Sequence, residues 1–418
     1  MKNSLLGLCF LVMVLALYFC PSSGLAQAWT QTGAPGETWR SVTCSSDGTR
    51  LIAAGDDGIC GSLDAGLTWL FLNPAASGSV ACSTDGTRII ASSSGAVLTS
   101  PDSGATWRQH ALTPDAQYCV ASSSDGTKLI AVGYAGIFGS IYLSADSGDT
   151  WTTPAAPTNF WVGSSWSAVA SSADGTKLAI AAEATIGDGS FLPGPIYTST
   201  NSGVSWTLSG APSNVWYSLA SSADGAKLVA AAYAGPSQIG GTGLIYISAD
   251  AGITWTNVSP PTNYWMSVAS STDGTHLIAV SLFDHSTLTP GVVWRSTNSG
   301  VNWNEDTLTG YFNSAASSAE GTKLAVTDVA RDLIYTLGEP VATAPASLPD
   351  LFIVTAGNQL SLTWGVSNAA GFLLFSTTNL APPSIWSQVT NLPTLGSNQI
   401  QVMLPYSPPN QFFRLSQP

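Results

Sequence analysis

The sequence predicts an all-β protein, and three observations lead to this prediction. Charged residues make up only 9% of the 418 residues, and Gly, Ser, Thr and Ala dominate, as is typical of many short strands joined by tight turns. An eight-residue turn motif recurs six times. A second turn motif, built on Asp-Gly, precedes each copy of the first. The chain is therefore expected to be an array of similar β units.

The first motif has the form Ser-x-Asp/Asn-x-Gly-x-Thr/Ser/Asn-Trp. A short side chain such as Asp102 or Asn201 can accept hydrogen bonds from backbone N–H groups of its own turn, and the Gly supplies a positive φ. The Trp buries a large ring beneath the turn. Each copy is therefore predicted to close a tight hairpin. The six copies are Ser62–Trp69, Ser100–Trp107, Ser144–Trp151, Ser199–Trp206, Ser248–Trp255 and Ser296–Trp303.

The second motif reads Val-Ala-Ser-Ser-x-Asp-Gly-Thr-Lys-Leu-Ile-Ala in its fullest form. Asp-Gly between two β-rich runs is a strong hairpin signal. Its acids are Asp47, Asp85, Asp125, Asp174, Asp224, Asp273 and Glu320, which are 38, 40, 49, 50, 49 and 47 residues apart. This period, with two turns per unit, is typical of a four-stranded propeller blade. Seven such turns predict a seven-bladed β-propeller.

The fourth unit illustrates the predicted blade, with strands at Ser167–Ser172, Lys177–Ala182 and Ile196–Ser199 and a last strand from Trp206 onward. The seventh unit stops at Tyr335-Thr336-Leu337 and has no copy of the first motif. The segment Trp29-Thr30-Gln31 resembles the strand that follows that motif elsewhere. We therefore expect an N-terminal strand to complete the last blade, which would hide both open edges of the ring.

These motifs resemble the Asp-box, or BNR, repeat of sialidase-like β-propellers, over residues 29–338 of the chain. The same repeat occurs in xyloglucanase-like hydrolases, sortilin-like receptors and photosystem II assembly factors, so the resemblance implies a fold rather than one activity. Sialidases use an arginine triad, a Tyr nucleophile with a Glu partner, an Asp acid and an Arg-Ile-Pro motif. No Arg-Ile-Pro occurs here, which disfavours sialidase activity. The basic patch of the photosystem factors is not expected in this acidic chain.

The two ends of the chain differ from the repeats. Residues 1–28 combine Lys2, an apolar run and a final Ala26-Gln27-Ala28, which predicts a secretory signal peptide and a secreted, cell-surface or periplasmic protein. Residues 339–349 have the Pro/Ala composition of a linker. Residues 350–418 hold several short apolar runs separated by turn residues and resemble a fibronectin type III or immunoglobulin-like β-sandwich. No later stretch has 18 consecutive apolar residues, so no membrane span is expected.

Charge and cysteine content limit the partners. The formal charge of −13 disfavours nucleic acid and anionic membranes. Cys44 and Cys82 hold the same repeat position, and an oxidising compartment would permit a bridge, although pairing among them, Cys60 and Cys119 stays open. There is no Cys/His cluster, so neither a metal site nor another cofactor is expected. The protein is expected to be a monomer.

The two ends of each blade are predicted to have different roles. In an antiparallel four-stranded blade both repeating turns lie on one face of the ring, which we call the turn face. The other two connections lie on the opposite face, which we call the loop face. The lengthened segments all belong to the loop face, where we expect the ligand. They are Thr153–Ser165, Glu183–Pro195, Tyr233–Gly243 and Phe283–Gly291.

Aromatic residues beside amides mark the loop face, and flat rings next to amides suit a sugar. The candidate ligand-binding residues are Phe160, Trp161, Trp166, Trp216, Tyr264 and Trp265. Five blades place an aromatic residue eight positions before the turn acid, which favours packing for Trp39, Trp166, Trp216, Trp265 and Phe312. Phe160 and Trp161 lie outside this register and are the stronger candidates.

The sequence thus favours a non-catalytic binding module for an extracellular glycan or protein. Two other functions stay open. Loop carboxylates such as Glu183 and Asp284 could act as acid and base of a glycoside hydrolase or lyase. Alternatively, the chain is a structural assembly or surface protein that attaches through its C-terminal module.

Overall fold

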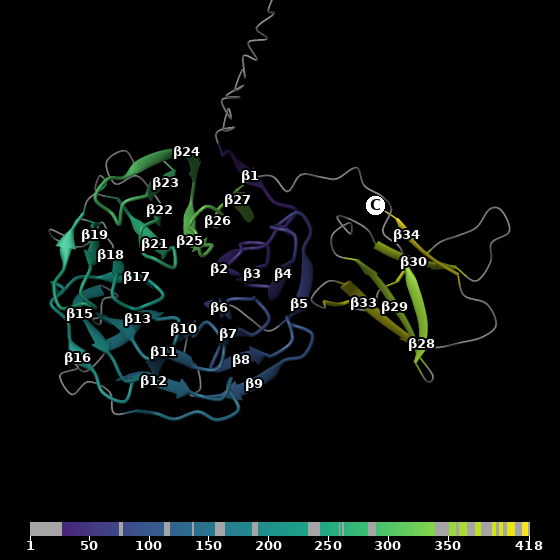
Figure 1. Ribbon diagram of the computed structural model, residues 1–418, viewed down its shortest axis with the longest axis horizontal. Helices are drawn as coiled ribbons and strands as arrows, with labels where there is room; N and C mark the ends of the chain where they lie inside the picture. Colours follow the sequence, from purple (N-terminus) through teal and green to yellow (C-terminus); the bar gives the residue numbers. More distant parts are fainter. Residues whose placement is uncertain are drawn as a thin grey trace, which may run out of the picture.

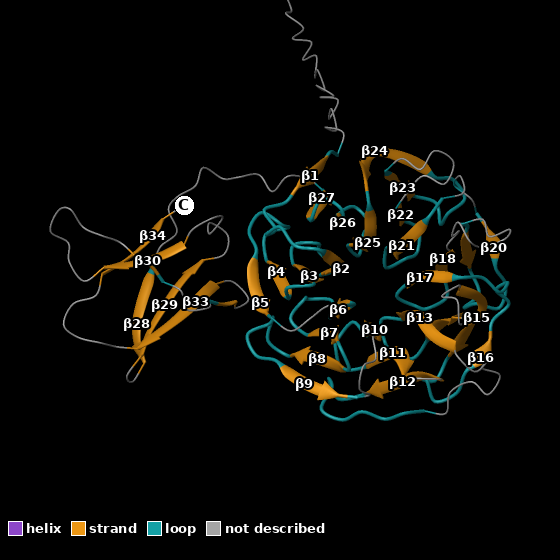
Figure 2. Ribbon diagram, turned by 180° about the vertical axis from the view of Figure 1, so that it is seen from behind, coloured by secondary structure: helices purple, strands orange, loops and turns teal. Residues whose placement is uncertain are grey.

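The computed structural model shows an all-β molecule, with no helix among the residues that it describes (Figure 2). It describes residues 27–338 with gaps at 75–77, 113–117, 136–137, 155–163, 186–190, 233–242, 259, 261–262 and 283–289. In the tail it describes residues 351–356, 359–365, 373–377, 387–389, 393–395, 399–405 and 412–416. Over these ranges no helical segment is long and apolar enough to cross a membrane.

Antiparallel sheets surround a common centre in the described part of residues 29–337, and one end strand of each sheet is innermost (Figure 1). We number these sheets by chain order. The first holds β2 (Trp39–Cys44), β3 (Leu51–Gly55), β4 (Ile59–Ser62) and β5 (Leu70–Asn73). The second holds β6 (Val80–Cys82), β7 (Ile89–Ser93), β8 (Ala96–Ser100) and β9 (Arg108–Ala111). The third has three strands, β10 (Tyr118–Ser122), β11 (Leu129–Ala135) and β12 (Phe138–Ser144).

Three further four-stranded sheets continue the ring. The fourth contains β13 (Ser164–Ser171), β14 (Leu178–Thr185), β15 (Phe191–Ser199) and β16 (Thr207–Leu208). The fifth contains β17 (Trp216–Ser221), β18 (Leu228–Ala232), β19 (Ile245–Ser248) and β20 (Thr256–Asn257). The sixth contains β21 (Trp265–Ser270), β22 (Leu277–Ser281), β23 (Gly291–Ser296) and β24 (Asn304–Gly310).

The seventh sheet joins the two ends of the ring. It contains β25 (Phe312–Ser317), β26 (Leu324–Asp328), β27 (Leu333–Leu337) and, as its outer strand, β1 (Trp29–Gln31). Trp29 pairs with Leu337 and Gln31 with Tyr335 in antiparallel register. The predicted pairing of the N-terminal segment with the last unit is therefore confirmed.

A ring of backbone hydrogen bonds links the inner strands on the turn face. In each sheet, the residue before the turn acid donates its N–H to the carbonyl of the equivalent residue in the next sheet. The seven residues, in order, are Ser46, Thr84, Ser124, Ala173, Ala223, Thr272 and Ala319, at N···O distances of 2.7–2.8 Å. Ala319 donates back to Ser46, so the circle closes on itself.

The hydrophobic core lies between adjacent sheets. One cluster joins Ile180 and Tyr197 of the fourth sheet to Ile130 and Ile141 of the third, and similar clusters recur around the ring. Short strands of Ala, Val, Ile and Leu suit this position because both faces of each inner strand are covered.

The tail forms two smaller sheets. One holds β28 (Phe352–Ala356), β29 (Gln359–Gly365), β33 (Gln399–Pro405) and β32 (Thr394–Leu395) in that order. The other holds β31 (Ser387–Gln388), β30 (Leu373–Thr377) and β34 (Phe412–Ser416). Leu362, Trp364 and Val402 are buried in the core of the tail. Strand alternation explains the pattern, since Leu360, Leu362 and Trp364 point to one side of β29.

Candidate functional site

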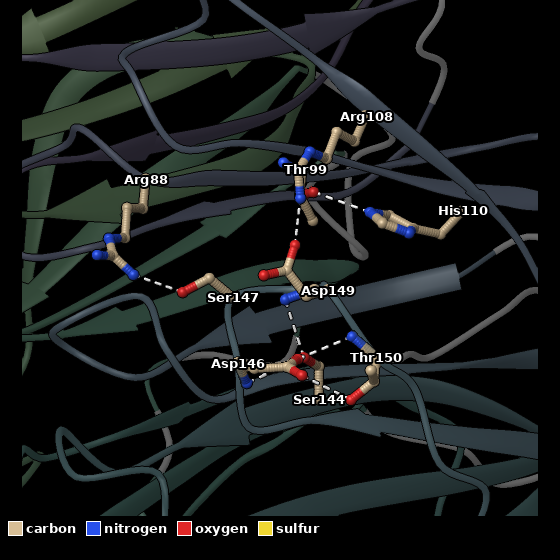
Figure 3. A network of polar contacts seen from close by, with 10 residues as sticks. Arg88, Thr99, Arg108, His110, Ser144, Asp146, Ser147, Asp149 and Thr150 are labelled. Atoms are coloured by element: carbon tan, nitrogen blue, oxygen red, sulfur yellow. Dashed lines mark hydrogen bonds and ion pairs between the residues drawn. The ribbon is translucent and has the colours of Figure 1, made fainter.

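The eight-residue motif uses its polar side chains inside its own turn. In the third sheet, Asp146 Oδ1 accepts from the Thr150 N–H at 2.9 Å and the Ser144 hydroxyl at 2.8 Å, and Oδ2 accepts from the Thr150 hydroxyl at 2.6 Å (Figure 3). The Gly148 N–H donates to Ser144 Oγ at 2.8 Å. The hydrogen bonds from Thr150 and Ser144 lower the pKa of Asp146 to about 2. The motif therefore holds an ionised carboxylate for structural reasons.

The carboxylates of the Asp-Gly turns also accept hydrogen bonds from residues of their own turns. Asp174 Oδ1 accepts from the Ser172 hydroxyl at 2.6 Å and the Thr176 N–H at 2.9 Å. These bonds lower the pKa of Asp174 to about 2. The lysine three residues later, Lys177, donates to the Asp224 carbonyl of the next sheet at 2.7 Å. The lysines and arginines at this position of the repeat therefore tie neighbouring sheets together.

Polar contacts also join the second sheet to the third (Figure 3). Arg88 donates to the Ser147 hydroxyl, and Arg108 forms an ion pair with Asp149. His110 Nε2 lies 2.9 Å from Thr99 Oγ1, and its pKa is lowered by burial and by the charge of Arg108. Together with the turns, these contacts use most polar groups of the turn face for internal bonding.

Four of the six aromatic candidates lie inside the ring. Trp166, Trp216, Tyr264 and Trp265 are buried, with exposed fractions of 4%, 0%, 6% and 0%. Trp216 Nε1 donates to the Gly194 carbonyl of the preceding sheet at 2.9 Å. Trp265 repeats this contact with the Gly243 carbonyl at 3.1 Å. These side chains pack between sheets and do not form an exposed shelf, so the expectation that they face a ligand is corrected.

The remaining candidates cannot be placed in full. Phe160, Trp161 and Asp284 lie outside the described residues. Glu183 belongs to β14, where its backbone pairs with Ser165 and Pro193, but its side chain is outside the described part. Of the predicted site residues, the structure therefore describes the side chains of Trp166, Trp216, Tyr264 and Trp265 alone.

A cavity of about 330 Å³ at the centre of the ring was not predicted from the sequence. Serine hydroxyls line it at the position six residues before the turn acid. Each accepts the backbone N–H of the next sheet's inner strand at 3.1–3.3 Å and keeps its own proton to donate. These residues are Ser41, Ser79, Ser218, Ser267 and Ser314. The recurrence of Ser at this position is the signal that could have revealed the cavity wall.

Three charged groups of the loop face have bonding partners in the structure. Glu37 is buried and accepts from the Asp57 N–H at 2.8 Å and the Gly58 N–H at 3.0 Å, and burial raises its pKa. Arg40 forms an ion pair with Asp56. Fully buried Asp328 accepts from the Arg331 guanidinium at 2.8 Å. These residues stabilise loops of the first and seventh sheets.

Among the described residues, no group of three or more His, Cys, Asp or Glu side chains is placed to hold a metal ion. Cys44, Cys60 and Cys82 are free thiols, and the Cys119 thiol donates to the Ser167 carbonyl at 3.1 Å. Burial raises the pKa of Cys82 to about 11 and that of Cys60 to about 12, which keeps both thiols protonated near neutral pH.

Comparison with solved structures assigns the fold. The chain is similar to the GH74 xyloglucanase of Xanthomonas campestris, with 16% identity, a TM-score of 0.56, and coverage of 81% of this chain and 59% of that one. It is also similar to the Niastella koreensis GH74 enzyme, with 16% identity, a TM-score of 0.55, and coverage of 89% and 69%. YCF48 bound to a D1 peptide matches with 14% identity, a TM-score of 0.52, and coverage of 75% and 96%.

These likenesses establish a β-propeller fold. The chain spans only 59% of the length of the Xanthomonas enzyme. No family model matches the sequence, and no curated protein matches it either.

Proposed function

We propose that the chain is a secreted, non-catalytic binding protein built on a closed seven-bladed Asp-box propeller and followed by a fibronectin- or immunoglobulin-like β-sandwich. Residues 1–28 act as the signal peptide, 29–338 form the propeller, 339–349 the linker and 350–418 the sandwich. The loop face recognises an extracellular glycan or protein. The closed backbone ring through Ala319 and Ser46 and the pairing of Trp29 with Leu337 support the closure.

The unequal use of the two faces of the ring carries this proposal. On the turn face, acids such as Asp146 and Asp174 accept three or more hydrogen bonds from their own turns. The lengthened segments of the third to sixth units all belong to the opposite face. Binding residues are disproportionately found on such irregular loops, which a rigid scaffold positions.

The central cavity suits recognition better than proton transfer. Its described lining consists of aliphatic residues, hydroxyls such as Ser218 and Ser267, Tyr217, and the thiols of Cys44 and Cys119, of which burial raises the pKa of Cys44. Hydroxyls that both donate and accept can match the hydroxyls of a sugar or the backbone of a peptide. Because the buried rings are used for packing, Phe160 and Trp161 remain the aromatic candidates for ligand contact.

A glycan array tests the proposal, using the full mature chain and two variants. Trp161→Ala should lose most of the binding because a stacking ring is removed. The matched control Leu208→Ala removes a side chain that is 58% exposed on strand β16 and should bind like the wild type. If the wild type binds no glycan and captures no extracellular protein, or if Trp161→Ala binds equally well, the proposal is wrong.

Glycoside hydrolysis is the second candidate, and the likeness to two GH74 enzymes favours it. In this case Glu183 and Asp284 would serve as the acid and the base of the loop face. Release of reducing ends from xyloglucan, lost in both Glu183→Gln and Asp284→Asn, would support hydrolysis. If the wild type releases no reducing ends, the result supports the proposal of a non-catalytic binding protein.

A further inference from the structure

A pocket of about 290 Å³ lies between the third and fourth sheets, at the turn face. It is separate from the central cavity, with which it shares no lining residue. Its apolar wall consists of Leu129, Ile130, Leu143, Leu178 and Val204. Hydroxyl groups of both turn motifs surround this wall. The pocket therefore combines an apolar interior with a polar rim.

The outer strand next to the pocket differs from its equivalents at one residue. The third residue after the motif's Trp normally extends the outer strand by donating its N–H to the neighbouring strand. In the third sheet this residue is Pro154, which has no N–H. The outer strand is reduced there to one bridge between Leu143 and Thr152. The equivalent donors elsewhere are Thr32 to Ile334 at 2.9 Å, Ser209 to Ile196 at 3.0 Å and Val258 to Ile245 at 3.0 Å.

The shortened strand leaves space next to the following turn. A Cβ built on Gly252 would find Ser209 among its nearest neighbours, and one built on Gly300 would find Val258. A Cβ built on Gly203, at the boundary in question, would meet Leu143 and Leu178 instead. No outer-strand side chain is among the three atoms nearest to this position at Gly203, whereas Ser209 and Val258 are at Gly252 and Gly300.

The next boundary provides a direct comparison. Between the fourth and fifth sheets, the equivalent space is lined by Lys177, Leu178, Leu228 and Ala251 and has a volume of only about 10 Å³. The two boundaries share the same turn motifs and the same lysine position. The boundaries differ in the outer strand and in two lining positions, since Ile130 and Leu143 line the larger pocket where Ala179 and Thr198 line the smaller one.

Lys128 provides a positive charge at the pocket. Its Nζ donates to the Asp174 carbonyl at 2.9 Å and to Ser202 Oγ at 3.4 Å. An ammonium group has three N–H donors, so one is left for a ligand. The carboxylate of Asp174 is bonded to Ser172 and Thr176 and therefore does not take this position.

We propose that this pocket binds a small monocarboxylate with an apolar tail about the size of a benzene ring. An apolar cavity of about 150 Å³ is enough to hold benzene, so the tail fits between Leu143 and Leu178. The carboxylate reaches Lys128 at the rim, where a charge-assisted hydrogen bond fixes its orientation. This site lies on the face opposite the loops and does not depend on the glycan or protein partner.

Calorimetric titration of the full mature chain with 3-phenylpropionate tests the site. The wild type should show saturable binding with one site per chain. Lys128→Met should weaken binding about tenfold or more, because the charged hydrogen bond is lost. The matched control Lys177→Met removes the same inter-sheet bond at the neighbouring boundary. It should bind the probe like the wild type.

The uncharged probe 3-phenyl-1-propanol separates charge from shape. It should bind the wild type and Lys128→Met equally. Absence of saturable binding of 3-phenylpropionate by the wild type overturns the proposal. Equal weakening by Lys128→Met and Lys177→Met also overturns it, because the effect would then come from loosened sheets. Thermal unfolding of each variant verifies that both lysine variants are folded.

Pro154→Val tests the cause of the pocket without touching its charge. Valine restores the N–H donor and supplies the side chain that Val258 provides in the fifth sheet. This variant should keep or raise the unfolding temperature and lose probe binding at least tenfold. Unchanged binding in a folded Pro154→Val variant would show that the pocket does not hold the probe.

Discussion

The two faces of the ring use carboxylates in different ways. On the turn face, Asp64 accepts two hydrogen bonds from Thr68 and one from Ser62 within its own turn. On the loop face, Asp57 is exposed and contributes its backbone N–H, which Glu37 accepts. The same residue type is thus a repeated structural element on one face and an individual loop residue on the other. Acidity alone therefore does not locate a site in this protein.

The comparison also shows where stability and recognition are separated. The turn face repeats one hydrogen-bond pattern in sheet after sheet, and the lysines and arginines of that pattern connect neighbouring sheets at six of the seven boundaries. Such a scaffold tolerates variable loops on its other face because the sheets are held together independently of them. The substitutions Trp216→Ala, Asp64→Ala and Asp146→Asn test this separation.

The largest loss of stability is expected for Trp216→Ala, although Trp216 lies toward the loop face. Its ring is fully buried and its Nε1 donates to the Gly194 carbonyl, so truncation leaves a cavity and an unpaired carbonyl. The free energy of unfolding should fall by about 3–5 kcal/mol, measured by urea denaturation. A loss below about 1 kcal/mol would show that this ring is not part of the scaffold.

A smaller loss of stability is expected for Asp64→Ala on the turn face. The substitution leaves the Thr68 N–H and two hydroxyls without their acceptor, and should lower the free energy of unfolding by about 1–3 kcal/mol. The matched control Asp57→Ala, on the loop face, should change it by less than about 0.5 kcal/mol. Equal losses in urea denaturation would contradict the separation of the two faces.

The repeating part of the fold was predictable from sequence because its determinants are local. Turn acids such as Asp174 bond to residues two positions away, and the Trp29 strand could be matched to the last unit by its likeness to other copies. Strand limits were less exact. Strand β15 begins at Phe191, five residues before the predicted Ile196, because Pro193 pairs with Glu183 across the sheet.

The candidate site was less predictable because exposure depends on neighbouring sheets. The spacing of Trp166, Trp216 and Trp265 indicated packing, and burial confirms it, but the adjacent Tyr264 was expected to face a ligand and is also buried. The indole partner of Trp216 lies 22 residues away in another sheet, so no local pattern reveals it. The pocket next to Pro154 depends in the same way on two sheets meeting.

The smallest loss of stability is expected for Asp146→Asn, which keeps the hydrogen-bonded turn and removes its negative charge. Asn201 holds the same position in the fourth sheet, where its Oδ1 accepts the Ser205 N–H at 2.9 Å and its Nδ2 donates to the Ser205 hydroxyl at 2.8 Å. The variant should therefore fold like the wild type. In the wild type, hydrogen bonding lowers the pKa of Asp146 from 3.8 to about 2.

A folded-state pKa below the unfolded value means that this carboxylate contributes stability above about pH 4, and that the contribution is lost as the pH falls toward 2. Urea midpoints measured from pH 7 to pH 2 should thus differ between wild type and Asp146→Asn at neutral pH and converge in acid. A constant difference across this range would mean that the turn recognises the shape of the side chain alone. In that case the charge of the turn face would be free to vary without affecting the scaffold, and only the geometry of the turn would be required.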